Sequence, residues 1–386
     1  MFVNKKGGSQ VLEAVRAIAP DIEAEAENTE RNRGLNPDLL VRLQEAGMFR
    51  MMIPKAYGGE EMTPLQVLRV VEELSRADAS AGWTAMVANG FNAIFGLFPQ
   101  VTIDEMMANG PDLRMRGALA PKGRLVEVEG GYRISGQWPL GSGSYQYDWV
   151  VGSGMVFDGP APKMVDGQPA ILLAAVRPEE AEFLDTWDSV GVRGSASHDF
   201  VLNDVFVPAS RVANMMGQSN LSSPVHRLPF PMVTTGQHTA ISTGGAMAAL
   251  ADLGKLARNK RPAFKPDQKL IDDPVFSYRF GELLARLDSL RSYADALMED
   301  TLELAQSNDP VTPGDIARAR SMCAKVSLDC VDLVNEAMAL GGSTIVYASH
   351  PMQRRWRDVR VAAQHAAAST DSYSELSAAY FSEELQ

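Results

Sequence analysis

The sequence predicts an α+β protein that is mainly helical, with its strands gathered in the middle of the chain. Apolar residues recur at helical spacing over 1–112, follow a strand-like pattern over 113–215 and return to helical spacing over 216–386. Strands do not alternate with helices, which argues against a Rossmann or TIM-barrel enzyme. We therefore expect three domains with these boundaries: an N-terminal helical domain, a middle antiparallel β domain and a C-terminal four-helix bundle.

The N-terminal segment contains clear helix signals. Residues 10–30 carry apolar side chains at helical spacing. Asn36-Pro37 and Thr63-Pro64 each place a capping residue directly before a proline, which is the usual start of a helix. A further apolar segment predicts a helix over 80–98.

The middle segment contains a β-hairpin signal. Two strand-like runs, 124–129 and 132–135, flank Gly130-Gly131, which suits a tight turn. Three more strand-like runs follow at 149–157, 170–177 and 199–207. These runs predict a small antiparallel sheet.

The C-terminal segment returns to helical spacing in four long stretches rich in Ala, Leu and Met. They are 234–260, 274–307, 312–340 and 351–385. Four helices of this length predict a bundle.

Composition and charge exclude several classes of function. The net charge of −12 argues against a nucleic-acid partner. No apolar run is long enough to span a bilayer and the N-terminus has no apolar leader, so we expect a cytoplasmic protein without a membrane partner. Cys323 and Cys330 lie about 10 Å apart along one helix, too far for a disulfide. No His/Cys group has metal-ligand spacing, so we expect no metal.

Several short segments carry a resemblance to one enzyme family. They are 132–143, 190–195 with 205–208, 336–342, and 355–358. These segments resemble, in order, the flavin-contacting strand and loop, the final strands, the Gly-Gly turn and the Arg-Asp helix start of the acyl-CoA dehydrogenase fold. The resemblance spans nearly the whole chain in the right order and implies that fold.

The resemblance also implies a set of flavin contacts and an oligomer. The implied cofactor-binding residues are Trp138, Leu140, Gly141, Ser142, Gly143, Arg261, Phe264, Gly341 and Gly342. Family members complete the flavin site with a neighbouring subunit's C-terminal bundle. A homotetramer is therefore implied, in which Gly341 and Gly342 serve another subunit's cofactor.

Two departures from acyl-CoA dehydrogenases bear on the chemistry. The family's acidic flavin- and substrate-contacting loop before the hairpin is replaced by 117–124, which contains no acid. Many dehydrogenases place a catalytic glutamate eight residues after the Arg-Asp aspartate, and counting from Asp358 reaches Ala366. Alanine cannot abstract the α-proton of a thioester. An alternative base position on an earlier helix, around Gly244-Gly245, also lacks an acid.

The residue beside Ala366 is His365, and this pattern resembles the two-component flavin-dependent monooxygenases of the same fold. That group includes oxygenase components acting on p-hydroxyphenylacetate, steroid phenols and dibenzothiophene. Ser142-Gly143 followed by Trp149 resembles their Ser-Gly…Trp loop. The segment 77–83 resembles their first-domain signature, whose tryptophan, here Trp83, lies near the active-site cavity.

The resemblance implies a reaction and roles for individual residues. Reduced flavin, FADH2 or FMNH2, would trap O2 as a C4a-hydroperoxide, and a separate NAD(P)H-dependent flavin reductase would supply it, since no nicotinamide-binding motif is present. Ser142 would hold the flavin N5–H, and His365 would stabilise the peroxide or deprotonate a phenol. Trp83 and His238 would contact a small aromatic or apolar substrate.

Two other functions stay open at this point. One is an acyl-CoA dehydrogenase or oxidase with a displaced catalytic base. The other is a non-catalytic relative that binds flavin or another ligand. Each implicated residue also has a structural interpretation: Ser142 as a turn residue, and Trp83 and His365 as packing residues.

Overall fold

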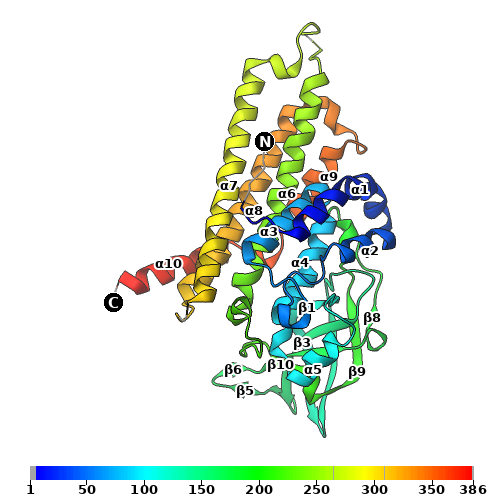
Figure 1. Ribbon diagram of the computed structural model, residues 1–386, viewed down its shortest axis with the longest axis vertical. Helices are drawn as coiled ribbons and strands as arrows, with labels where there is room; N and C mark the ends of the chain where they lie inside the picture. Colours follow the sequence, from blue (N-terminus) through cyan, green and yellow to red (C-terminus); the bar gives the residue numbers. More distant parts are fainter. Residues whose placement is uncertain (1–5, 264, 308, 385–386) are drawn as a thin grey trace.

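A computed structural model describes residues 6–263, 265–307 and 309–384, and its elements follow the order helices, strands, helices (Figure 1). The N-terminal helices are α1 (Gln10–Asn32), α2 (Pro37–Glu45), α3 (Pro64–Ala77), α4 (Ala79–Ile94) and α5 (Gln100–Met107). The longer strands are β1 (Met115–Val128), β2 (Gly131–Trp138), β3 (Trp149–Asp158), β7 (Ile171–Val176) and β9 (Phe200–Pro208). The shorter strands are β4 (Ala161–Pro162), β5 (Met164–Val165), β6 (Gln168–Pro169), β8 (Glu182–Phe183) and β10 (Val212–Asn214). The C-terminal helices are α6 (Phe230–Asn259), α7 (Pro274–Gln306), α8 (Pro313–Gly341), α9 (Pro351–Ala362) and α10 (Asp371–Glu384). The predicted α+β class, mainly α, is confirmed.

The predicted helix starts are confirmed at the level of hydrogen bonds. The Asn36 side chain accepts the Asp38 N–H at the start of α2. Thr63 and Gln66 form a reciprocal capping box at the start of α3. These caps satisfy amide groups that have no partner within the helix, which is why the sequence marked the starts so well.

The main sheet corrects one expectation, because it is not wholly antiparallel. Its strand order is β10-β7-β3-β1-β2-β9-β8. β1 and β2 form the expected hairpin, but β1 and β3 run parallel, with Met115 opposite Trp149. A parallel pair needs a connection that returns to the starting end of the sheet. Here β2 carries the chain back. The loop 139–148, which contains Ser142, then passes the first residues of β1 and leads into β3.

α6 is the central helix of the C-terminal bundle. It contacts α7, α8 and α9, and also α3 and α4 from the N-terminal segment. Its small residues make this possible: a Cβ on Gly244 would lie 2.4 Å from the Glu72 carbonyl oxygen, and one on Gly245 would lie 2.5 Å from Val359 Cγ2. Close approach from several sides buries most of its surface, so α6 shows no clear polar face.

A second correction concerns the last predicted helix, which is broken. α9 ends at Ala362, the short 3₁₀ helix η9 spans Ala366–Ala368, and α10 begins at Asp371. His365 is therefore the N-cap of η9 and does not lie on a long helix. Side chains cause the break: His365 Nδ1 accepts the Ala367 N–H at 3.1 Å, and Ser369 Oγ accepts the Asp371 N–H at 3.4 Å. Such local bonds compete with the helical ladder.

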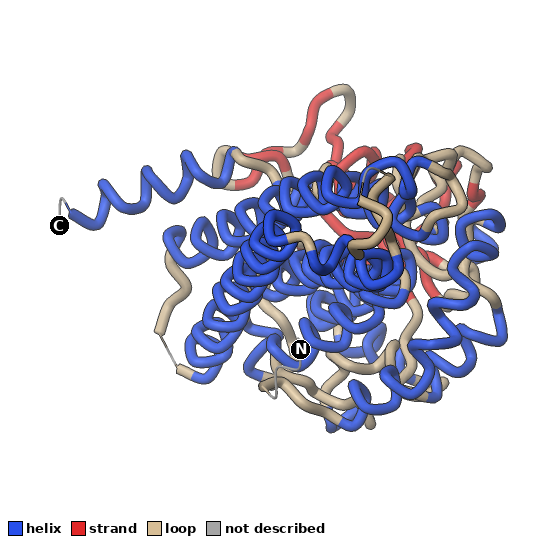
Figure 2. The backbone as a smooth tube through the Cα atoms, turned by 90° about the horizontal axis from the view of Figure 1, so that it is seen from above, coloured by secondary structure: helices blue, strands red, loops and turns tan. Residues whose placement is uncertain are grey.

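The overall arrangement places the sheet at one end of the molecule and the helical bundle at the other, with α1–α4 between them (Figure 1). α10 leaves the bundle and projects from the body in both views (Figures 1 and 2). Within the described residues, no helix has the length and apolar character needed to cross a membrane. In the same part of the chain, no three His, Cys, Asp or Glu side chains are grouped so that they could hold a metal ion.

Candidate active site

Three of the predicted site residues meet in one cluster of aromatic rings. Trp83 lies on α4, His238 on α6, and His365 caps η9. The imidazole rings of His238 and His365 stack at a centroid distance of 4.7 Å. The Trp83 indole meets both rings edge to face, at 5.8 Å from His238 and 5.6 Å from His365. The structure thus joins residues from three separate segments.

Hydrogen-bond partners assign the tautomers of the two histidines. His365 Nδ1 accepts the Ala367 N–H, so its proton lies on Nε2. His238 Nε2 lies 3.0 Å from the Ala362 carbonyl oxygen, so this nitrogen donates and Nδ1 carries a lone pair. Burial lowers the pKa of both histidines, and proximity to His365 lowers that of His238 further. Both rings are therefore neutral near pH 7.

The ring cluster runs from the interior to the surface. His238 and Trp83 are buried, whereas the His365 side chain is exposed to solvent. Desolvation by the surrounding protein nevertheless lowers the pKa of His365. Within the described residues, Trp83 Nε1–H and His238 Nδ1 have no hydrogen-bond partner. Buried polar atoms rarely stay unpaired, so a donor and an acceptor are available here for a ligand or water.

The second group of predicted residues lies on the loop 139–148. Leu140 has a φ of 59° and a side chain that is 56% exposed. The Ser142 hydroxyl lies 2.6 Å from Ser197 Oγ and 3.4 Å from the Leu140 carbonyl oxygen. Gly143 has a φ of 144°, and a Cβ there would lie 2.5 Å from Arg116 Cβ. Only glycine fits this position without displacing Arg116.

Arg116 is a part of this site that the sequence did not reveal. Its guanidinium is buried and donates to the carbonyl oxygens of Gly141 at 2.7 Å and Ala196 at 2.9 Å. The guanidinium also lies 3.7 Å from the centroid of the Phe183 ring. Burial lowers the pKa of Arg116 to about 10. Nothing in the spacing around residue 116 marks it, because its partners come from distant loops.

Trp138 occupies a different environment from the other members of its group. Its side chain is 0% exposed and stacks on Phe200 at 4.9 Å inside the sheet domain. Its indole N–H donates to the Ser153 carbonyl oxygen at 2.7 Å. The flavin contact that the resemblance implies for Trp138 stays a prediction.

Arg261, Gly341 and Gly342 form a third group at the end of the bundle. Lys260 directly precedes Arg261, and its Nζ donates to the Gly341 carbonyl oxygen at 2.6 Å. Arg261 itself donates to the Pro266 carbonyl oxygen. Arg261 follows α6, whose 30 residues span about 45 Å, whereas Gly341 ends α8 and Gly342 is its C-cap. Figure 1 places the end of α6 far from the sheet. Phe264 lies outside the described residues.

The residues on the loop 139–148 fit a flavin. Leu140 offers an exposed apolar side chain for a flat ring, and Ser142 offers a hydroxyl whose hydrogen-bonding capacity is not exhausted. Gly143 lets the loop pass close to Arg116. An apolar surface beside a single polar handle suits the ring and the N5 edge of an isoalloxazine.

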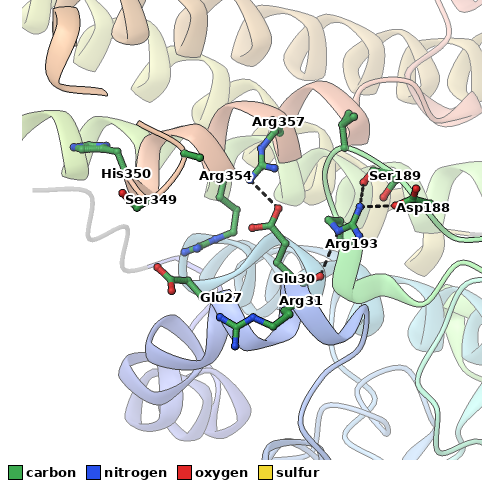
Figure 3. Close-up of a pocket in the computed structure, with 12 residues that line it drawn as sticks. Glu27, Glu30, Arg31, Asp188, Ser189, Arg193, Ser349, His350, Arg354 and Arg357 are labelled. Atoms are coloured by element: carbon green, nitrogen blue, oxygen red, sulfur yellow. Dashed lines mark hydrogen bonds and ion pairs between the residues drawn. The ribbon is translucent and has the colours of Figure 1, made fainter. Parts of the chain in front are cut away.

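A surface pocket among the described residues lies elsewhere. It has a volume of about 590 Å³ and is lined mainly by charged side chains from α1, the loop before η4 (Arg193–Ser195) and the start of α9 (Figure 3). Several of these groups already pair, such as Arg357 with Glu30 at 2.7 Å. Neither the ring cluster nor Ser142 lines this pocket.

Comparison with known proteins places the chain in a family. The sequence models "Acyl-CoA dehydrogenase, N-terminal domain" and "Acyl-CoA dehydrogenase, C-terminal domain" match residues 8–97 and 237–370. An indole-3-acetate monooxygenase from Pseudomonas putida is 30% identical over 354 residues, which cover 91% of this chain and 88% of that protein. The chain belongs to the flavin-dependent monooxygenases of the acyl-CoA dehydrogenase fold.

Further relatives match this chain over more than nine-tenths of its length. The flavin-dependent monooxygenase oxygenase subunit HsaA of Rhodococcus jostii is 28% identical, over 92% of this chain and 94% of that one. The crystal structure of 3-HSA hydroxylase from Rhodococcus sp. RHA1 superposes with a TM-score of 0.88 at 26% identity, covering 97% of both chains. The predicted fold and family are confirmed.

Proposed function

We propose that this chain is the oxygenase component of a two-component flavin-dependent monooxygenase. It uses reduced flavin, FADH2 or FMNH2, and O2 to hydroxylate a small aromatic or apolar substrate. The observation that carries this proposal is the stacked pair His238–His365, which the Trp83 ring contacts edge to face. These three side chains are neutral and mostly apolar, they offer a few polar atoms, and none of them is a carboxylate.

The protein's contribution follows from the groups in place. Bound reduced flavin supplies the two electrons that split O2, so that one oxygen atom enters the substrate and the other leaves as water. His365 Nε2–H can offer a proton, while Nδ1 accepts the Ala367 N–H. Trp83 Nε1–H and His238 Nδ1 can orient a substrate hydroxyl or ring N–H. The buried rings keep water away from the reacting atoms.

The dehydrogenase alternative is weaker on this geometry. The acid nearest to His365 in the Arg-Asp segment is Asp358, which is buried and accepts the Val192 N–H at 2.7 Å. Burial, together with the neighbouring Asp78 carboxylate, raises the pKa of Asp358 to about 7. Its carboxylate thus holds a loop in place. Ala366, where a base would stand, carries no proton-accepting group.

The partners follow from the same proposal. The words "oxygenase subunit" in the name of the HsaA relative imply a separate supplier of reduced flavin, which we take to be an NAD(P)H-dependent flavin reductase. A homotetramer accounts for the third group, because Arg261 follows α6, Gly341 ends α8, and Figure 1 shows the end of α6 away from the sheet. These residues would contact the flavin of a neighbouring subunit.

A direct experiment tests the proposed function. The purified chain is mixed with reduced FAD or FMN, air and a panel of phenols, indoles and amines, with and without ¹⁸O₂. We expect a hydroxylated product that carries one ¹⁸O atom and depends on reduced flavin. Anaerobic bleaching of protein-bound oxidised flavin by an acyl-CoA, without any oxygenated product, would instead support the dehydrogenase. Flavin binding without either reaction would support a non-catalytic relative.

A further inference from the structure

A chain of three serine hydroxyls leads from the interior of the sheet domain to the loop 139–148. Ser195 Oγ lies 2.8 Å from Ser197 Oγ, which lies 2.6 Å from Ser142 Oγ. Ser195 and Ser197 are fully buried, and Ser142 retains 7% exposure. The chain therefore ends at the one hydroxyl that a ligand can reach.

Hydrogen-bond accounting gives the chain a direction. Each hydroxyl has one proton and two lone pairs. Ser195 Oγ has Ser197 Oγ as its one side-chain partner among the described residues. If Ser197 donated to Ser195, the Ser195 proton would be buried without an acceptor, which costs about 1–3 kcal/mol. Ser195 therefore donates to Ser197, and Ser197 donates to Ser142.

This direction defines what Ser142 can offer. Ser142 accepts from Ser197 and can turn its own proton to the Leu140 carbonyl oxygen at 3.4 Å. One lone pair of Ser142 then remains without a partner among the described residues. The hydroxyl is prepared as an acceptor, and so suits a ligand atom that carries a hydrogen.

The backbone of the loop that carries Ser195 and Ser197 is fixed. Val192 and Ala196 have φ values of 50° and 48°, which are unfavourable for residues with side chains, and most of all for valine. Such conformations persist where surrounding contacts enforce them. Here the Val192 N–H donates to Asp358, and the Gly194 N–H donates to Ser80 Oγ at 3.1 Å.

The loop carrying Ser197 is also joined directly to the loop carrying Ser142. Arg116 bonds to the Gly141 and Ala196 carbonyl oxygens at the same time. The Gly143 N–H donates to the Ser195 carbonyl oxygen at 3.3 Å. The distance between the two hydroxyls is therefore set by the backbone, and does not depend on mobile side chains.

We propose that Ser197, oriented by Ser195, is a positioning residue that holds the Ser142 hydroxyl as a hydrogen-bond acceptor for the flavin N5 position. This rests on the proposed function, in which Ser142 contacts N5. Reduced flavin carries a hydrogen on N5, whereas oxidised flavin has a lone pair there. An acceptor whose own proton bonds to the Leu140 carbonyl oxygen favours the reduced form, because oxidised flavin could bond to Ser142 only by taking that proton away from Leu140.

Anaerobic titrations measure this preference without any turnover. The ratio of the Kd for oxidised flavin to the Kd for reduced flavin is determined for the wild type, Ser142→Ala, Ser197→Ala, Ser197→Thr and the double variant. We expect Ser142→Ala and Ser197→Ala each to lower the ratio about two- to ten-fold, the range of one hydrogen bond. Ser197→Thr keeps the hydroxyl and should retain most of the ratio. The double variant should fall no further than Ser142→Ala alone.

Controls separate positioning from a loss of structure. Ser75→Ala removes another buried hydroxyl, which donates to the Val71 carbonyl oxygen at 2.7 Å, and should leave the ratio unchanged. If Ser197→Ala does not fold, Ser195→Ala serves in its place, because it removes the donor that sets the direction of the chain. It should lower the ratio in the same sense by a smaller factor.

The outcomes distinguish this inference from the proposed function. A lower ratio for Ser142→Ala with an unchanged ratio for Ser197→Ala and Ser195→Ala would overturn the positioning role and leave the function intact. An unchanged ratio for Ser142→Ala would overturn both the N5 contact and the inference. Wild-type protein that binds no flavin would refute the proposed function itself.

Discussion

The imidazole ring of His238 stacks on that of His365 at 4.7 Å, although the two residues come from different helical segments. Their bonds are complementary: His238 donates to the Ala362 carbonyl oxygen at the end of α9, and His365 accepts from η9. The pair therefore fixes the break between α9 and η9 against α6. Because the rings are neutral, they can stack without charge repulsion.

Replacing His365 should impair chemistry more than binding. Since the ring can offer Nε2–H as a proton donor, His365→Ala should lower the rate of product formation about 10²–10⁴-fold, the usual range for a general acid or base. The Kd for reduced flavin should change little. Product analysis and anaerobic titration measure the two quantities. Gln364→Ala, an exposed neighbour, is the matched control; equal losses in both variants would contradict a specific role for His365.

The buried histidine should make stability depend on pH. The pKa of His238 is lowered well below its usual 6.5, so between that folded value and 6.5 the unfolded chain binds more protons than the folded one. The stability that neutral His238 contributes is present above pH 6.5 and is lost as pH falls below it. His238→Gln should therefore reduce the slope of the free energy of unfolding against pH. For one titrating group this slope is at most about 1.4 kcal/mol per pH unit.

The measurement for this prediction is the difference between two unfolding curves. Asp358 changes the pH dependence of stability in the opposite direction, because its raised pKa makes the folded state bind more protons between about pH 4 and 7. Subtracting the curve of His238→Gln from that of the wild type removes this shared contribution. A difference that stays constant between pH 7.5 and 5 would show that His238 does not titrate as predicted.

Glu72 should be a critical residue for stability. It is buried between α3, α6 and α7, where it pairs with Arg69 at 2.8 Å and Arg291 at 2.7 Å and accepts from Thr243. These partners hold the pKa of Glu72 below its usual value despite burial. Glu72→Gln removes the carboxylate that Arg69 and Arg291 share, although Arg69 keeps its ion pair with Asp295, and should cost about 3–5 kcal/mol in the free energy of unfolding.

A surface pair provides the comparison for Glu72. Asp21 and Arg42 form an exposed ion pair at 2.7 Å, and Asp21→Asn should change the free energy of unfolding by about 0–1 kcal/mol. Both values come from denaturant titration of the same preparation. A loss for Glu72→Gln as small as that for Asp21→Asn would show that the buried cluster contributes little net stability.

If the flavin site is shared between subunits, two inactive variants should complement each other. His365→Ala disables the ring cluster, and Arg261→Glu disables the group at the end of the bundle. In randomly mixed oligomers, about a quarter of the sites would combine an intact cluster from one chain with an intact Arg261 from another. Co-expression of differently tagged chains, followed by activity assays, measures this. No recovery in verified mixed oligomers would place both groups in one subunit's site.

The sequence by itself determined the local features and the family. Helix starts were predictable because Asn36 and Thr63 bond to amides only two or three residues away. Ala366 and its neighbour His365 were found by counting eight residues from Asp358, and such a count requires no knowledge of the folded structure. The hairpin at Gly130-Gly131 was predictable for the same reason, since a tight turn depends on adjacent residues.

Only the tertiary structure decided which of these residues meet. The contacts of His365 with Trp83 and His238 depend on how α4 and α6 pack. The parallel pairing of β1 and β3, the buried Arg116 and the link from Ser197 to Ser142 likewise join distant segments. Propensity and spacing act over a few residues, whereas these contacts are set by the packing of whole helices and strands.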